Sequence, residues 1–127
     1  MTDLGIGIVG GGYMGKAHAV AMSAVGAVFN TKLRPKLRAV AANSIESATR
    51  YQSAYGFEKA CANWEDLVAD PSVEAVIIAT PQSMHRLIAE AAFALGKPVL
   101  CEKPLAANLD DARAMVAAAD AAGVINM

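Results

Sequence analysis

Short apolar runs alternate with helical patterns along the whole chain, and this alternation limits the possible folds more than any other feature. The strand-like runs occupy residues 4–9, 37–42, 59–62, 73–79 and 98–101, with a last one starting at 124. The helical patterns between them cover about residues 12–25, 44–56, 63–68, 84–96 and 108–123. Strands connected by helices run parallel, so the sequence predicts a doubly wound α/β sheet of about six strands, in the order 3-2-1-4-5-6.

Size and composition agree with one such domain. The chain has 127 residues, of which 55% are hydrophobic and 18% charged, so it can form a core of ordinary size and is not intrinsically disordered. A formal charge of −1 gives no electrostatic footprint for nucleic acid or an anionic membrane, and no apolar run is long enough to span a bilayer. Cys61 and Cys101 cannot form the framework of a secreted mini-domain, which favours a cytoplasmic location.

A glycine-rich turn, Gly-Gly-Gly-Tyr-Met-Gly, follows the first strand-like run and opens an amphipathic helix. In this context Gly10 permits the sharp turn, Gly12 leaves room for a pyrophosphate, and Gly15 lets the helix pack against the first strand. The free N–H groups at the helix start, those of Tyr13 and Met14 among them, can then bind the anion. We therefore predict a dinucleotide site, with a tight turn that binds no ligand as the alternative.

The end of the second strand bears on the choice between NAD and NADP. An acidic residue there would bind both ribose hydroxyls of NAD and repel the 2′-phosphate of NADP. The sequence has Asn43 and Ser44 instead, two neutral groups that suit either cofactor, and its first acid is Glu46 in the next helix. Arg38 or Arg50 could lie nearby. NADP is therefore mildly favoured, although Asn43 and Ser44 could equally serve only as helix caps.

Three segments together resemble one known family. Residues 7–15 with His18, residues 79–85 (Ala-Thr-Pro-Gln-Ser-Met-His) and residues 96–105 (Gly-Lys-Pro-Val-Leu-Cys-Glu-Lys-Pro-Leu) are similar, in order and spacing, to segments of the glucose–fructose oxidoreductase/inositol dehydrogenase (Gfo/Idh/MocA) family. The resemblance covers the whole chain. It implies the Rossmann-type, NAD(P)-binding domain of an oxidoreductase that transfers hydride between nicotinamide and a sugar, inositol or related polyol.

The resemblance also implies roles for residues around one crevice, at the carboxyl ends of the first, fourth and fifth strands. Lys103 would point at the junction of nicotinamide and substrate, where an ammonium can orient a hydroxyl or stabilise a developing alkoxide. Glu102 would contact the cofactor's ribose. Pro104 would shape the turn, often after a cis peptide bond in relatives. Thr80 and Pro81 would border the nicotinamide.

The remaining polar candidates have less specific roles. His85 matches the family's histidine, and we expect a structural or cofactor-side role rather than a catalytic one. His18 lies on the buried stripe of the first helix, which predicts a satisfied core histidine. The two histidines lack the spacing of a metal site, and none is predicted. We expect Cys101 to be a small strand residue rather than a nucleophile, and Trp64 to anchor its short helix.

These predictions contain no catalytic acid or base. In the family that group, usually a histidine or aspartate, lies in a second domain after the Glu-Lys-Pro turn, together with the substrate contacts and the subunit interface. We therefore expect residues 1–127 to be a truncated dinucleotide-binding domain, inactive alone, of an enzyme that is a homo-oligomer when intact. The alternative is a stand-alone dinucleotide-binding or regulatory module. A different Rossmann enzyme, such as a methyltransferase, is disfavoured by the Glu-Lys-Pro turn.

Overall fold

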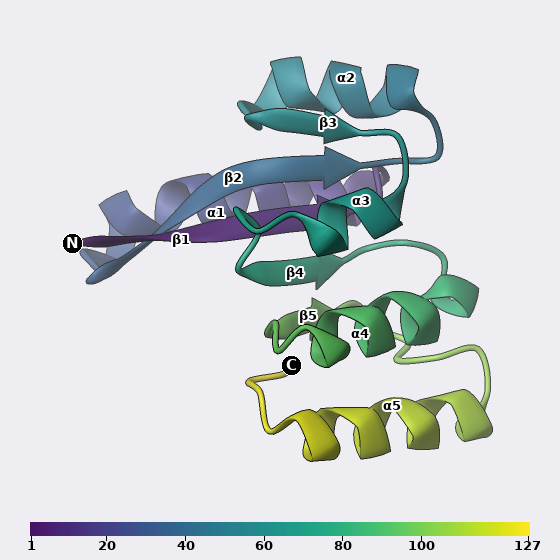
Figure 1. The fold of residues 1–127 in the computed structure, drawn as a ribbon. Coiled ribbons are helices and arrows are strands. Elements are labelled where there is room, and N and C mark those ends of the chain that lie inside the picture. The colour runs from purple at the N-terminus through teal and green to yellow at the C-terminus, as the bar shows by residue number, and fades with distance from the viewer.

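Five parallel strands form one sheet in the order β3-β2-β1-β4-β5 in the computed structural model, which describes all 127 residues (Figure 1). The strands are β1 (Thr2–Val9), β2 (Leu33–Ala41), β3 (Lys59–Cys61), β4 (Ala75–Ile78) and β5 (Val99–Cys101). The helices are α1 (Tyr13–Phe29), α2 (Ile45–Tyr55), α3 (Trp64–Ala69), α4 (His85–Ala94) and α5 (Leu109–Ala122), with a 3₁₀ turn η1 (Gln82–Met84) before α4. The doubly wound α/β class is therefore confirmed.

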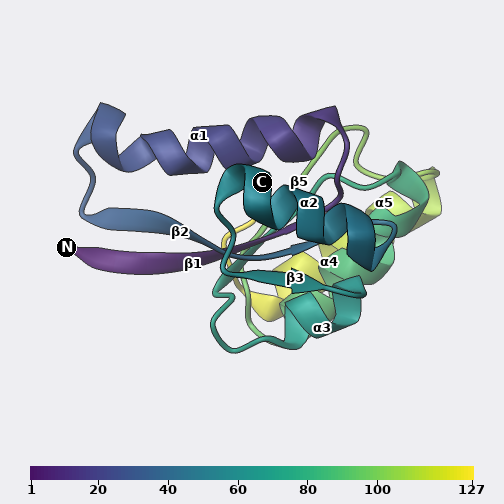
Figure 2. The same ribbon diagram turned by 90° about the horizontal axis from the view of Figure 1, so that it is seen from above.

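The helices lie on both faces of the sheet and give the domain two apolar cores. α1 and α2 cover one face, and α3, α4 and α5 cover the other (Figure 2). The first core is built from seven buried side chains: Ile6, Ile8, Ala19, Leu37, Val40, Phe57 and Ile77. The second is larger, with 15 buried residues centred on β4, α3 and α4. The central strands β1 and β4 contribute side chains to both cores, as expected for a sheet covered on both faces.

The register of the sheet aligns the carboxyl ends of all five strands. Val9 pairs with both Ala41 and Ile78, Ala41 pairs with Cys61, and Ile78 pairs with Cys101. The loops that follow these residues therefore begin side by side along one edge of the sheet. In open parallel sheets this edge is where ligands bind, at the point where the strand order reverses.

The sixth strand is not confirmed. Residues 125–127 run beside β5, and Cys101 N–H donates to the Met127 carbonyl at 2.8 Å. Only one bridge forms, between Val99 and Asn126, so this segment does not build the successive pairs that define a strand. The sheet therefore has five strands rather than about six.

The connection between the first helix and the second strand is shorter than the predicted ranges, 12–25 and 37–42, imply. α1 continues to Phe29, where Asn30 adopts a left-handed conformation with φ of 48°, and β2 already begins at Leu33. Arg34 explains this difference, because its guanidinium donates to the carbonyl of Gly26 and so satisfies the end of the helix. The charged Arg34 therefore belongs to β2 and contacts the end of α1, rather than lying in a loop.

Candidate nucleotide-binding crevice

The glycine turn between β1 and α1 depends on close backbone packing at two of its positions. Gly10 has φ of +115°, and a Cβ there would lie 2.3 Å from the carbonyl oxygen of Ala79. A Cβ on Gly15 would lie 2.1 Å from the carbonyl oxygen of Gly10, so α1 packs directly against the turn. A Cβ on Gly12 would meet nothing within 4 Å. The space beside Gly12 is open, as a bound pyrophosphate would require.

Helix α1 begins without a side chain that caps its N–H groups. Its N-cap residue is Gly12, and no acidic residue lies in its first turn. By contrast, Ser44, Asn63 and Asn108 cap α2, α3 and α5 through side-chain oxygens. Tyr13 and Met14 are both exposed, with 84% and 38% of their surface accessible. The start of α1 therefore leaves its N–H groups available to an anion.

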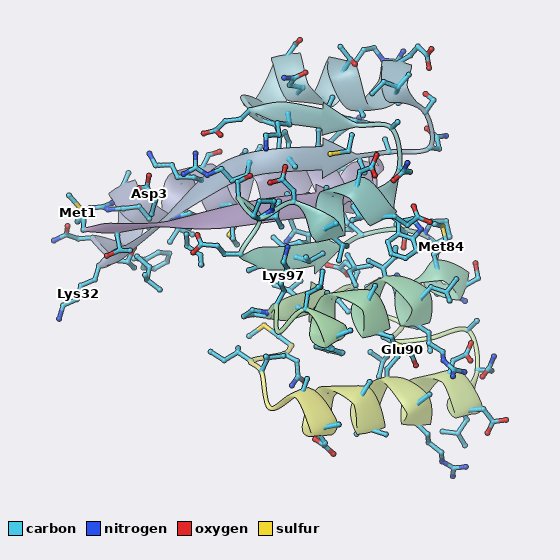
Figure 3. All side chains as sticks on the ribbon, viewed as in Figure 1. Met1, Asp3, Lys32, Met84, Glu90 and Lys97 are labelled. Atoms are coloured by element: carbon cyan, nitrogen blue, oxygen red, sulfur yellow. The ribbon has the colours of Figure 1, made fainter.

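A cleft of about 630 Å³ lies along the carboxyl edge of the sheet. Among its lining residues are five of the predicted cofactor contacts: Gly10, Gly12, Asn43, Thr80 and Pro81. It is also lined by four side chains that were not predicted to contact a cofactor: Ser47, Tyr51, Trp64 and Met84. Figure 3 shows Met84 at this edge, with Met1, Asp3 and Lys32 at the opposite end of the sheet. Trp64 packs against the core beneath α3 as expected, and it is also a wall of the cleft.

Asn43 and Ser44, which follow β2, were considered either as cofactor contacts or as helix caps, and the structure places them differently. Ser44 accepts a hydrogen bond from Ser47 N–H at 3.1 Å and caps α2, whereas Asn43 lines the cleft. No carboxylate is among the lining residues. The guanidinium of Arg50 lies 3.0 Å from the Ser47 hydroxyl, one turn into α2.

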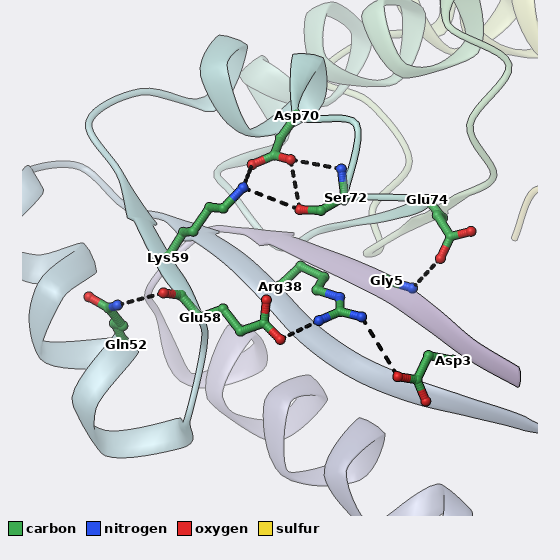
Figure 4. Close-up of polar contacts among 9 residues, drawn as sticks. All are labelled: Asp3, Gly5, Arg38, Gln52, Glu58, Lys59, Asp70, Ser72 and Glu74. Carbon is green, nitrogen blue, oxygen red and sulfur yellow. Dashed lines mark hydrogen bonds and ion pairs between the residues drawn. The ribbon is translucent and has the colours of Figure 1, made fainter.

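The other cation considered from the sequence lies elsewhere. Arg38 pairs with Asp3 and Glu58, away from the residues that line the cleft (Figure 4). Of the two arginines, only Arg50 hydrogen-bonds to a residue that lines the cleft, namely Ser47.

His85 is buried and joins two loops of the crevice. Its Nε2 lies 2.9 Å from the carbonyl oxygen of Thr80, and its Nδ1 lies 3.1 Å from that of Leu105. The first carbonyl belongs to the loop after β4, and the second follows the Glu-Lys-Pro turn. Only 1% of the residue is exposed. Both ring nitrogens face backbone carbonyls, which favours the structural role expected for this histidine over a catalytic one.

His18, predicted as a satisfied core histidine, is largely shielded from water and has a hydrogen-bond partner at the crevice. Its Nε2 lies 2.9 Å from Oε1 of Glu102, which is 84 residues away in the sequence. The second oxygen of Glu102 accepts a hydrogen bond from the backbone N–H of Lys103 at 3.2 Å. The hydrogen bond from His18 is the largest of the effects that lower the pKa of Glu102. Helix α1 thus contacts the Glu-Lys-Pro turn directly, a contact that helical periodicity alone could not reveal.

Lys103 and Cys101 lie on either side of Glu102 in different environments. Lys103 is exposed, its ammonium takes part in no hydrogen bond or ion pair, and its peptide bond to Pro104 is cis. Burial raises the pKa of the Cys101 thiol to about 11, with a further contribution from Glu102. A thiol with such a pKa is protonated at neutral pH, in agreement with its interpretation as an unreactive strand residue.

Comparisons with known proteins agree with this geometry. Residues 4–127 match the model of the Gfo/Idh/MocA oxidoreductase family, described as an NAD-binding Rossmann fold. The chain belongs to this family. Over 128 aligned residues it is 36% identical to levoglucosan dehydrogenase from Pseudarthrobacter phenanthrenivorans, an alignment that covers 100% of this chain and 33% of that protein.

Solved structures of family members superpose closely. An NAD-binding oxidoreductase from Klebsiella pneumoniae gives a TM-score of 0.94 at 43% identity, over 98% of this chain and 33% of that one. Levoglucosan dehydrogenase in complex with NADH and L-sorbose also gives 0.94, at 34% identity, over 99% of this chain and 35% of that one. The chain therefore spans about a third of the length of these relatives. None of its helices is both long and apolar enough to cross a membrane.

Proposed function

We propose that residues 1–127 form the dinucleotide-binding domain of a longer NAD(P)-dependent oxidoreductase that acts on a CH–OH group of a sugar, inositol or related polyol. The observation that carries this proposal is the alignment of four loops on one edge of the sheet. Gly12, Asn43, Thr80 and Glu102 each follow a strand whose last residues pair in one continuous row. The substrate class is supported by levoglucosan dehydrogenase, whose structure contains the sugar L-sorbose together with NADH.

In this proposal the cofactor lies across the edge of the sheet. The N–H groups at the start of α1, from Tyr13 to Gly15, bind the pyrophosphate beside the open space at Gly12. Asn43 serves the adenosine ribose, with Ser44 fixing the start of α2. Thr80, Pro81 and the His85 tether border the nicotinamide, and Glu102 binds its ribose. When bound, the dinucleotide supplies or accepts the hydride.

Lys103 is proposed to be the catalytic residue that this domain contributes. Its ammonium is exposed beside Glu102 and has no partner within the chain, so it is free to contact a substrate. There it would orient the hydroxyl and stabilise the developing alkoxide, a type of interaction worth about 2–4 kcal/mol of transition-state stabilisation. The acid or base and the substrate contacts would come from residues outside these 127, as would the interface of a homo-oligomer.

We also propose that NADPH binds more tightly than NADH, and that the protein works in the cytoplasm. The cleft has no carboxylate that would repel a 2′-phosphate. Arg50, which hydrogen-bonds to the cleft residue Ser47, is close enough to attract that phosphate. Relatives crystallised with NADH and with NAD show that the family also accepts the unphosphorylated cofactor. The two cysteines stand on the two outer strands, β3 and β5, where they cannot pair, which suits a reducing compartment.

Titration of the purified chain with both cofactors tests these proposals. Trp64 is the only tryptophan and lines the cleft, so its fluorescence reports binding. The isosteric change Asn43→Asp should weaken NADPH binding at least about tenfold and leave NADH within about threefold, because a carboxylate repels the phosphate. Ser44→Ala is the matched control: it removes a helix cap of about 1 kcal/mol and should not change the ratio of the two affinities. Failure of the wild-type chain to bind either cofactor would contradict the proposed function.

A further inference from the structure

The hydrogen bond between His18 and Glu102 joins two residues of the crevice that are 84 positions apart in the sequence. Both side chains are largely shielded from water, with 16% and 15% of their surface accessible. Water therefore competes poorly for this hydrogen bond, and a bond to an ionised carboxylate is stronger than one between neutral groups. No other side chain hydrogen-bonds to the Glu102 carboxylate, so its orientation depends on His18 and on the Lys103 N–H.

His18 is also fixed to the opposite half of the cofactor site. It stands one turn after Gly15 on α1, the helix whose start faces the open space at Gly12. Gly15 and Ala19, which flank it, are buried against the sheet. A helix packed in this way moves as one body over a single turn. The pyrophosphate end of the crevice and the Glu-Lys-Pro turn are therefore connected by one helical turn and one hydrogen bond.

From this arrangement we infer that His18 is a positioning residue for the nicotinamide half of the site, acting through Glu102. By donating to Oε1, His18 directs the remaining oxygen of Glu102 toward the Lys103 backbone and the ribose position. Through this second oxygen, His18 also fixes the backbone position of Lys103. This inference rests on the proposed function, because its ligand is a nicotinamide dinucleotide.

Two ligands separate this role from a general effect on folding. ADP contains the adenosine and pyrophosphate of the cofactor and lacks the nicotinamide ribose that Glu102 would hold. His18→Leu should weaken NADH binding about five- to tenfold while ADP stays within about twofold. His18→Gln keeps an N–H donor of similar reach and should keep NADH within about twofold of the wild type. Calorimetry with the complete 127-residue chain measures these affinities for the wild type and both variants.

Further variants make the result specific to Glu102. In a Glu102→Ala background, His18→Leu should change NADH affinity by no more than about twofold, because the contact is already lost. Met22→Ala, one turn further along the same side of α1, is the control for packing and should leave the NADH-to-ADP ratio unchanged. If His18→Leu does not fold, His18→Asn replaces it, since its shorter amide cannot reach Glu102. An equal loss for NADH and ADP, or no loss for NADH, would overturn the inference. Absence of binding to the wild type would instead overturn the proposed function, and this inference with it.

Discussion

Individual residues of the glycine turn have separable effects on stability and on binding. Gly10→Ala places a Cβ 2.3 Å from the Ala79 carbonyl at φ of +115°, which should lower the free energy of unfolding by about 2–4 kcal/mol. Gly12→Ala meets open space at φ of −81°, so it should cost less than about 1 kcal/mol. It should nevertheless weaken NADH binding at least about tenfold, because the methyl group occupies the pyrophosphate position.

Urea denaturation and Trp64 fluorescence measure the two quantities in the same samples. The two substitutions add the same methyl group two residues apart, so each is the control for the other. A Gly12→Ala chain that binds NADH like the wild type would contradict the placement of the pyrophosphate. A Gly10→Ala chain of unchanged stability would contradict the close packing of the turn against the loop after β4.

The residues that could be predicted are those whose role depends on near neighbours in the sequence. The positions of the three glycines follow from a strand, a turn and a helix within 15 residues, and the caps at Asn63 and Asn108 follow from their own helices. His18 was predicted as a satisfied core histidine, but its partner could not be named from the sequence. Its partner is 84 residues away, and only the order of β1, β4 and β5 in the sheet brings the two together.

At the level of elements, periodicity predicted the helices more accurately than their buried faces. The helical pattern over residues 84–96 places six apolar side chains on one face: Met84, Leu87, Ile88, Ala91, Ala92 and Leu95. The structure buries Ile88 and Ala92 of this set, together with Phe93, whereas Leu87 and Leu95 are 62% and 56% exposed. Spacing alone therefore makes the apolar face too wide, and packing against β4 and α5 decides which part of it is buried. Tertiary contact also decided the end of α1, through Arg34.

The connection between α3 and β4 is held by an acidic residue with a strongly shifted pKa (Figure 4). Asp70 accepts hydrogen bonds from Lys59 Nζ at 2.6 Å and from Ser72 N–H at 2.8 Å. These contacts, led by Lys59 and the Ser72 side chain, lower the pKa of Asp70 to about 2 from an ordinary 3.8. Lys97 donates to the carbonyls of Val68 and Asp70 and closes the same segment. Burial lowers the pKa of Lys97.

This element should give the domain a defined acid sensitivity. Because the folded-state pKa of Asp70 lies below the unfolded one, its stabilisation is present above about pH 4 and is lost as the pH falls toward 2. Asp70→Asn should lower the free energy of unfolding by about 1–2 kcal/mol at pH 7 and by much less at pH 2. Asp120→Asn, at an exposed position without a partner, should leave the acid limb unchanged. Urea denaturation at a series of pH values checks this, and parallel curves for Asp70→Asn and the wild type would contradict it.

At the scale of the whole molecule, the parallel topology assembles a cofactor site from segments that are far apart in the sequence. The Gly-rich, Asn43, Thr-Pro and Glu-Lys-Pro segments each follow a different strand, and the register sets their ends in one row. All the segments of this row lie within residues 1–127. The chemistry is different: both histidines already have hydrogen-bond partners, and Lys103 is the one cation that this domain offers beside the proposed nicotinamide position.

The 127-residue chain should therefore bind its cofactor without catalysing hydride transfer. We expect saturable binding of NADPH or NADH by Trp64 fluorescence, and no cofactor reduction above the blank with inositol, glucose or another polyol, because no acid–base group faces the substrate position. Lys103→Met should leave cofactor affinity within about threefold, because an ammonium that contacts the substrate adds little to binding of the cofactor alone. Absorbance at the reduced-nicotinamide band follows turnover directly. Robust turnover by the wild-type chain would contradict the proposal that the acid or base comes from residues outside these 127. A large loss of affinity in Lys103→Met would show that Lys103 holds the cofactor instead.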